Sequence, residues 1–160
     1  MKTFFASFVR PVLEINSIIW SPDTLWIYVN KIERVQRFFL RKIDGFSQLQ
    51  YSARLEHIGL NTLQYRRIMF DLMFLYKILT GHTICNIYNH LNFKAPYTTR
   101  GHTFKLDFPD VLRNKTRRFF NCRIVDHWNK LPVSALNCIS IDSFQHCIIR
   151  SVPDNYICNN

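Results

Sequence analysis

Arginines and lysines at helical spacing are the residues of this sequence best suited to binding another molecule. Arg34, Arg37 and Arg41 recur every three or four positions, so a helix would place them on one side. Rows of such cations attract phosphate backbones or anionic membrane surfaces. A solvated helix face is the alternative, and charge alone does not decide between the two. Two further groups have the same character: Arg66 with Arg67, and the set Lys115, Arg117, Arg118 and Arg123.

The positive charge of the chain is concentrated in two blocks. The net charge is +10, from 21 Lys and Arg against 11 Asp and Glu. Residues 31–67 and residues 100–130 each carry eight basic and three acidic groups, which gives +5 in each block, and the remainder of the chain balances. We therefore expect two basic surfaces.

No complete catalytic motif occurs in the sequence. Gly-rich phosphate loops, the H-E-x-x-H zinc motif and the nucleophile elbow are all missing, and the carboxylates are scattered. Asp126 and His127 are adjacent on an expected helix, so their side chains diverge by about 100° and do not form an acid–base pair. We predict that the chain is not an enzyme on its own and holds no catalytic residue, metal ion or cofactor.

The five cysteines and the N-terminus bear on the compartment. The cysteine number is odd and no C-x-x-C occurs, which favours reduced thiols in an intracellular protein, nuclear or cytoplasmic. Zinc binding by His146, Cys138, Cys147 and Cys158 is conceivable, but their gaps fit no usual ligand spacing. The apolar run in "MKTFFASFVRP" is short and no cleavage site follows it, so we predict that the protein is not secreted. No membrane association is expected, because no uncharged apolar stretch reaches about 18 residues.

The elements that position the cations are predicted to be mainly helices. The "WIYVNKIERVQRFFLRKI" region predicts a helix over 24–43, with Ile32, Val35, Phe39 and Ile43 inward and the arginines on the opposite side. Glu33 stands four residues before Arg37, in the favourable orientation for a surface ion pair. Two other helices are expected over 3–19, with a kink at Pro11, and over 52–57. A third should begin with a capping-box-like start at Asn61 and end at Gly81. Of the last two, one should end at Pro132 and the other should begin at a Ser140 cap.

The remaining pattern completes a mainly α fold. "HTFKLDF", residues 102–108, alternates and predicts a short extended or β segment whose partner is not evident. We divide the chain into a helical region over 1–81, a linker loop over 82–101, a C-terminal extension over 102–152 and a frayed tail over 153–160. The extension would hold the short strand and a C-terminal pair of helices.

Six segments, in order, resemble the C-terminal region of reverse transcriptases from non-LTR retrotransposons, the jockey-like LINE group. They are "FASFVRPVLEINSIIWSP", "KIERVQRFFLRKIDG", "RLEHIGLNTLQYRRIMFDLMFLYKILTG", "TRGHTFKL", "RRFFNCRIVDHWNKLP" and "SIDSF". The likeness spans about residues 4–150. The chain departs from the family pattern in "LWIYVN", which is more apolar than usual, and at Ile15, where the family has Tyr. These departures suit a decayed copy.

The resemblance implies a polymerase thumb, a helical bundle that lies against the template–primer duplex, followed by a C-terminal extension. The palm carboxylates of the Tyr-x-Asp-Asp motif, which hold Mg²⁺ in the parent polymerase, are absent here. The expected function is that of a truncated RNA-directed DNA polymerase that binds RNA/DNA template–primer weakly and without sequence specificity, and also contacts other parts of the parent polymerase. Its phosphate contacts would be Arg34, Arg37, Arg41, Arg66, Arg67, Lys115, Arg117, Arg118 and Arg123. The alternative is a non-enzymatic helical module that binds a protein and has no nucleic-acid role.

Overall fold

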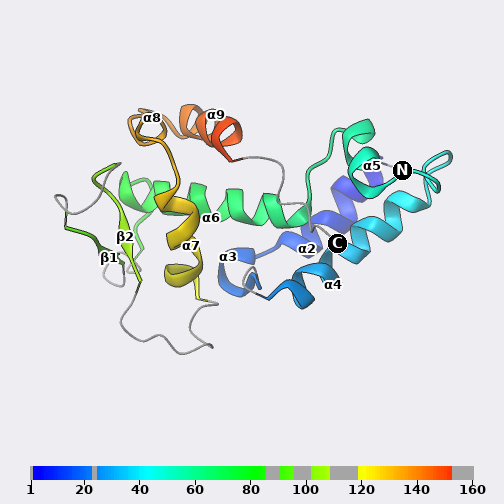
Figure 1. Ribbon diagram of the computed structural model, residues 1–160, viewed down its shortest axis with the longest axis horizontal. Coiled ribbons are helices and arrows are strands. Elements are labelled where there is room, and N and C mark those ends of the chain that lie inside the picture. Colours follow the sequence, from blue (N-terminus) through cyan, green and yellow to red (C-terminus); the bar gives the residue numbers. More distant parts are fainter. Residues whose placement is uncertain (1, 23–24, 86–90, 96–101, 109–118, 153–160) are drawn as a thin grey trace. The chain divides into compact units, whose positions relative to one another are not determined.

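The computed structural model describes residues 2–22, 25–85, 91–95, 102–108 and 119–152, and in these ranges the fold is mainly helical, as predicted (Figure 1). The chain divides into two compact units between Arg67 and Ile68. This division lies inside the long helix α6, Leu63–Leu79, rather than after Gly81 as the sequence suggested. The predicted tail over 153–160 lies outside the described residues.

The N-terminal segment of the first unit is helical but interrupted. The helix α1 (Lys2–Phe4) continues into a π-helical turn, η1 (Phe5–Val9), and then into α2 (Arg10–Glu14). The wide π turn ends two residues before Pro11, which cannot donate a backbone hydrogen bond. The sharper break comes later, where Asn16 adopts a left-handed backbone with φ of 52° before α3 (Ser17–Trp20). Pro11 is therefore accommodated, and Asn16 redirects the chain.

Three helices complete the first unit. They are α4 (Trp26–Arg41), α5 (Tyr51–Ile58) and the first turn of α6. Gly59 ends α5 with a positive φ of 65°, and its N–H donates to carbonyls of the last turn. Phe5 is fully buried and packs on Phe39 of α4, with ring centroids 4.9 Å apart. The expected helices over 24–43 and 52–57 are thus present with slightly different ends.

The second unit is built around the rest of α6. Tyr76 of α6 stacks on Phe144 with centroids 4.1 Å apart, and Trp128 packs beside Phe144, so three aromatic side chains form its centre. Gly81 has a positive φ of 74° just past the end of α6, where the sequence predicts the helix to stop. The helices around this core are α7 (Phe120–Asn129), α8 (Val133–Leu136) and α9 (Ile141–Ser151).

A two-stranded antiparallel sheet belongs to the second unit. The strand β2 (Leu106–Asp107) confirms part of the extended segment predicted over 102–108. Its partner, β1 (Asn92–Phe93), lies in the stretch predicted to be a linker loop. The side-chain amide of Asn129 extends this pairing, because it accepts from the N–H of Leu106 at 2.9 Å and donates to its carbonyl at 2.8 Å. The amide therefore acts as a further strand would and ties the sheet to α7.

Candidate nucleic-acid interface

The helix α4 presents a row of four exposed cations. Lys31, Arg34, Arg41 and Lys42 are all exposed, and no ion pair joins any of them to a carboxylate in the described part of the chain. They span 12 residues, or about 16 Å along the helix, and fall within about 100° of its circumference. The row therefore offers four adjacent cations on one side of a rigid element.

The buried side of α4 differs from the side that the apolar pattern predicts. Val29, Glu33, Gln36 and Leu40 are all at most 1% exposed, whereas Val35, expected inside, is 39% exposed. The helix is thus rotated by roughly 90° from the predicted orientation. The reason is that two polar residues lie at the centre of the buried side and find hydrogen-bond partners there.

Glu33 is the main polar anchor of α4. Both of its carboxylate oxygens accept from the N–H of Leu63, at 3.2 and 3.1 Å, and Oε1 also accepts from the hydroxyl of Tyr51. Leu63 begins α6, so the carboxylate satisfies an otherwise unpaired helix N–H and meets the positive end of the helix dipole. Burial, and then the neighbouring negative charge of Glu33, raise the pKa of Tyr51, which keeps its hydroxyl a donor.

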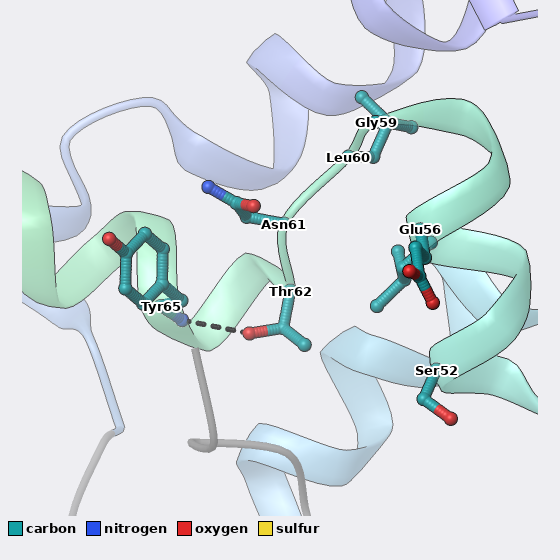
Figure 2. A pocket seen from close by; sticks show the side chains of 8 residues that line it. Ser52, Glu56, Gly59, Leu60, Asn61, Thr62 and Tyr65 are labelled. Atoms are coloured by element: carbon teal, nitrogen blue, oxygen red, sulfur yellow. Dashed lines mark hydrogen bonds between the residues drawn. The ribbon is translucent and has the colours of Figure 1, made fainter. Parts of the chain in front are cut away.

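Gln36 and Thr62 complete this anchor. The amide of Gln36 donates to the Tyr51 hydroxyl and to the carbonyl of Asn61, both at 3.0 Å. Thr62 accepts from the N–H of Tyr65 at 3.1 Å, as Figure 2 shows, so Thr62 rather than Asn61 caps α6. The predicted surface pair of Glu33 with Arg37 is replaced by these buried contacts.

Arg37 is half-buried and lies over an aromatic ring. Its guanidinium carbon is 5.0 Å from the centre of the Tyr51 ring, and Nη2 donates to Asn30 at 3.5 Å. Of the three arginines predicted to form one row on this helix, Arg34 and Arg41 are exposed, and Arg37 turns toward Tyr51. The sequence analysis did not include Lys31 and Lys42 in this row. Lys31 stands three residues before Arg34 and Lys42 directly follows Arg41, and this spacing could have identified both as members.

Two other predicted phosphate contacts, Arg66 and Arg67, are engaged within the first unit. Arg66 forms a two-point ion pair with Glu14, whose side chain is 9% exposed. Burial, and then the charge of Arg66, lower the pKa of the nearby Arg10. Arg67 is completely buried. These positions do not present free cations on the surface of the first unit.

Arg123 is likewise structural. Its Nε donates to one carboxylate oxygen of Asp71 at 2.7 Å and its Nη2 to the other at 2.9 Å, and both side chains are at most 3% exposed. The structure therefore removes Arg67 and Arg123 from the predicted contact set, because a phosphate does not reach a guanidinium in the protein interior. Lys115, Arg117 and Arg118, also predicted contacts, lie outside the described residues.

Aromatic side chains are interleaved with the α4 cations. Lys31 lies 5.4 Å from the ring centre of Tyr28, and Lys42 lies 5.3 Å from that of Phe38. Both rings are largely exposed, at 49% and 63%. Such rings hold long basic side chains in place, and exposed rings beside cations are typical of surfaces that bind nucleotide strands.

The hollow that α5 and the start of α6 enclose carries no chemistry of this kind. It has a volume of about 450 Å³ and its one charged lining residue is Glu56 (Figure 2). Within the described ranges, no group of three or more His, Cys, Asp or Glu is placed to hold a metal ion. The helices of those ranges include none with the length and apolar character needed to cross a membrane.

Comparison with known proteins adds no family assignment: no protein-family model, curated protein or solved structure matches the chain significantly.

Proposed function

We propose that these 160 residues are the thumb and C-terminal extension of a non-LTR retrotransposon reverse transcriptase, and that they bind template–primer duplexes through α4. The six ordered sequence segments and the mainly helical fold support this origin. The observation that carries the binding proposal is the exposed row of Lys31, Arg34, Arg41 and Lys42. Contacts of this type hold a phosphate backbone and carry no base specificity.

A second candidate function is a helical module that binds a protein. An exposed apolar stripe on the N-terminal helices favours it. Phe4, Phe8 and Val12 recur every four residues, and Ile15 and Ile19 lie on the two sides of the break at Asn16; each of the five is more than half exposed. Contiguous apolar surface of this kind marks an interaction site.

Titration with a labelled RNA–DNA hybrid at several salt concentrations separates the two functions. We expect binding whose affinity falls steeply with salt, because bound phosphates release counterions. Absence of binding at low salt, or binding indifferent to salt, would favour the protein partner. Primer extension by these 160 residues with added Mg²⁺ should yield no product, because they contain no Tyr-x-Asp-Asp motif, and any nucleotide incorporation contradicts this expectation.

A pair of charge-matched variants locates the interface. Arg34→Gln/Arg41→Gln and Lys130→Gln/Arg150→Gln each remove two exposed positive charges, the first pair from α4 and the second from elsewhere. On a B-DNA duplex, each lost phosphate contact changes the slope of log affinity against log salt by about 0.9. For the first variant we expect this slope to be smaller in magnitude by about 1.8, and for the second variant we expect the wild-type slope. Equal effects would mean that net charge, and not the α4 row, drives binding.

The proposed origin has its own test in the genomic DNA immediately upstream of the coding sequence. An open or decayed frame encoding the Tyr-x-Asp-Asp motif is expected there. Unrelated sequence upstream, with no trace of a polymerase palm, would contradict the origin and leave the binding proposal to stand on the titration.

A further inference from the structure

Two cysteine thiols of the second unit touch one another. The Sγ atoms of Cys138 and Cys147 are 3.3 Å apart, and both side chains are half-buried. Cys138 lies in the turn between α8 and α9, and Cys147 lies on α9, nine residues later. The two short helices are consecutive in the chain (Figure 1).

Contacts on both sides hold this turn in place. The hydroxyl of Tyr76 donates to the carbonyl of Cys138 at 2.6 Å, and the Tyr76 ring stacks on Phe144 of α9. Ser140 caps α9 by accepting from the N–H of Ser143 at 3.1 Å. The backbone of Cys138 and the helix that carries Cys147 are therefore fixed to one common residue, Tyr76. The thiols meet because the fold holds them together, and not through chance rotation of two surface side chains.

We propose that Cys138 and Cys147 form a reversible disulfide by exchange with a small-molecule disulfide of the glutathione type. A disulfide bond is about 2.05 Å long, so the two sulfur atoms need to approach by little more than 1 Å. Rotation of the side chains and slight adjustment of the four-residue turn supply this movement. Forming the bond removes two electrons and two protons from the pair of thiols. The pair is thus a modification site distinct from the α4 surface.

The exchange proceeds in two balanced steps. The thiolate of one cysteine attacks a sulfur of the small disulfide, forms a mixed disulfide and releases one small thiolate. The second cysteine then loses its proton and attacks the protein sulfur, which releases the second small thiolate. Burial, and then the hydrogen bond and charge of Cys147, raise the pKa of Cys138 to about 11. Cys147 is therefore the first nucleophile and Cys138 the resolving thiol, because Cys138 remains protonated at neutral pH.

The bond would tie the turn between α8 and α9 to α9 itself. Closing a loop of about ten residues lowers the entropy of the unfolded chain, and the chain-entropy model gives roughly a 100-fold gain in the folding equilibrium constant. By thermodynamic linkage, the native protein should then oxidise roughly 100-fold more readily than the unfolded chain.

Mass spectrometry of a tryptic digest tests the pair directly. Residues 131–150 form one tryptic peptide that contains both cysteines and no internal Lys or Arg. After equilibration in glutathione buffers and blocking of free thiols, an internal disulfide makes this peptide lighter by two hydrogen atoms than its reduced, unblocked form. A bond to any other cysteine would instead join two peptides. We expect the internal bond in the native protein, with half-oxidation at a roughly 100-fold more reducing glutathione ratio than in urea.

Single Cys→Ser variants test which thiols form the bond and in which order they react. Cys85→Ser should keep the internal bond, whereas Cys138→Ser and Cys147→Ser should each abolish it, with circular dichroism confirming that the variants fold. Cys138→Ser should accumulate a mixed disulfide on Cys147, and Cys147→Ser should leave Cys138 largely unmodified. Equal oxidation in native and urea-unfolded protein, or two blocked thiols in the native peptide under oxidising buffer, overturns the proposal.

Discussion

Replacing Glu33 with Gln tests the buried anchor that sets the orientation of α4. The substitution keeps the size of the side chain but removes its charge and replaces one acceptor oxygen with an N–H₂ group. In the native protein both acceptors are used, by the N–H of Leu63 and the hydroxyl of Tyr51. The new amide would therefore place a donor against a donor in a site that is 1% exposed.

The expected loss of unfolding free energy is large for one polar substitution. A hydrogen bond to a charged group contributes about 1.5–3 kcal/mol, and a neutral replacement about 1 kcal/mol. A carboxylate at a helix N-terminus adds about 0.3–1 kcal/mol. Losing one of two such bonds and weakening the other gives about 2–4 kcal/mol. The surface pair with Arg37 that the sequence suggests would be worth only about 0.3–0.5 kcal/mol.

Urea unfolding followed by far-UV circular dichroism measures the difference. Arg37→Gln is the matched control, because it removes only a half-buried cation–π contact and a long hydrogen bond to Asn30, together worth about 1 kcal/mol. Tyr51→Phe should destabilise less than Glu33→Gln, and the two together should cost less than their sum, since they share one hydrogen bond. If Glu33→Gln and Arg37→Gln cost the same within about 0.5 kcal/mol, the buried anchor is refuted.

Two further outcomes concern the second unit. Asp71→Asn should cost about 3–5 kcal/mol in urea unfolding because it breaks the buried ion pair with Arg123, whereas Asp71→Leu/Arg123→Met should recover much of that loss; a double variant no better than the single one contradicts this. His102 donates from Nε2 to the carbonyl of Trp128 at 3.2 Å, and its Nδ1 lacks a hydrogen-bond partner in the described residues. Burial lowers the pKa of His102 below the ordinary 6.5. As the pH falls from 7 through 6.5, the unfolded chain therefore binds a proton at this residue before the folded protein does, and the free energy of unfolding decreases. His102→Gln should flatten this part of the stability profile.

Local patterns were sufficient to predict most helices. Periodic apolar residues and punctuating glycines located α5 and α6, and Gly59 and Gly81 both have the positive φ that the sequence implies. The Ser140 cap of α9 is present as predicted. These features depend on neighbours within four or five residues, which is the range that a periodic pattern describes.

Contacts between distant residues could not be predicted in this way. Asp71 and Arg123 are 52 residues apart in the sequence, and nothing in either local pattern indicates that the two charges are buried together. β1 and β2 pair through two residues each, which is too short for an alternating pattern to reveal β1. The touching thiols of Cys138 and Cys147 also depend on a turn held from α6 by Tyr76.

The α4 surface shows why charge counting overestimates a basic interface. Counting treats every cation alike, yet the fold places Arg67 and Arg123 inside and leaves Arg34 and Arg41 outside. The residue that determines this on α4 is an acid: because Glu33 satisfies the N-terminus of α6, the helix turns its polar Glu33–Gln36 side inward. That rotation brings Lys31 and Lys42, which an arginine count ignores, into the exposed row. The composition of the proposed interface therefore follows from a buried carboxylate that does not belong to it.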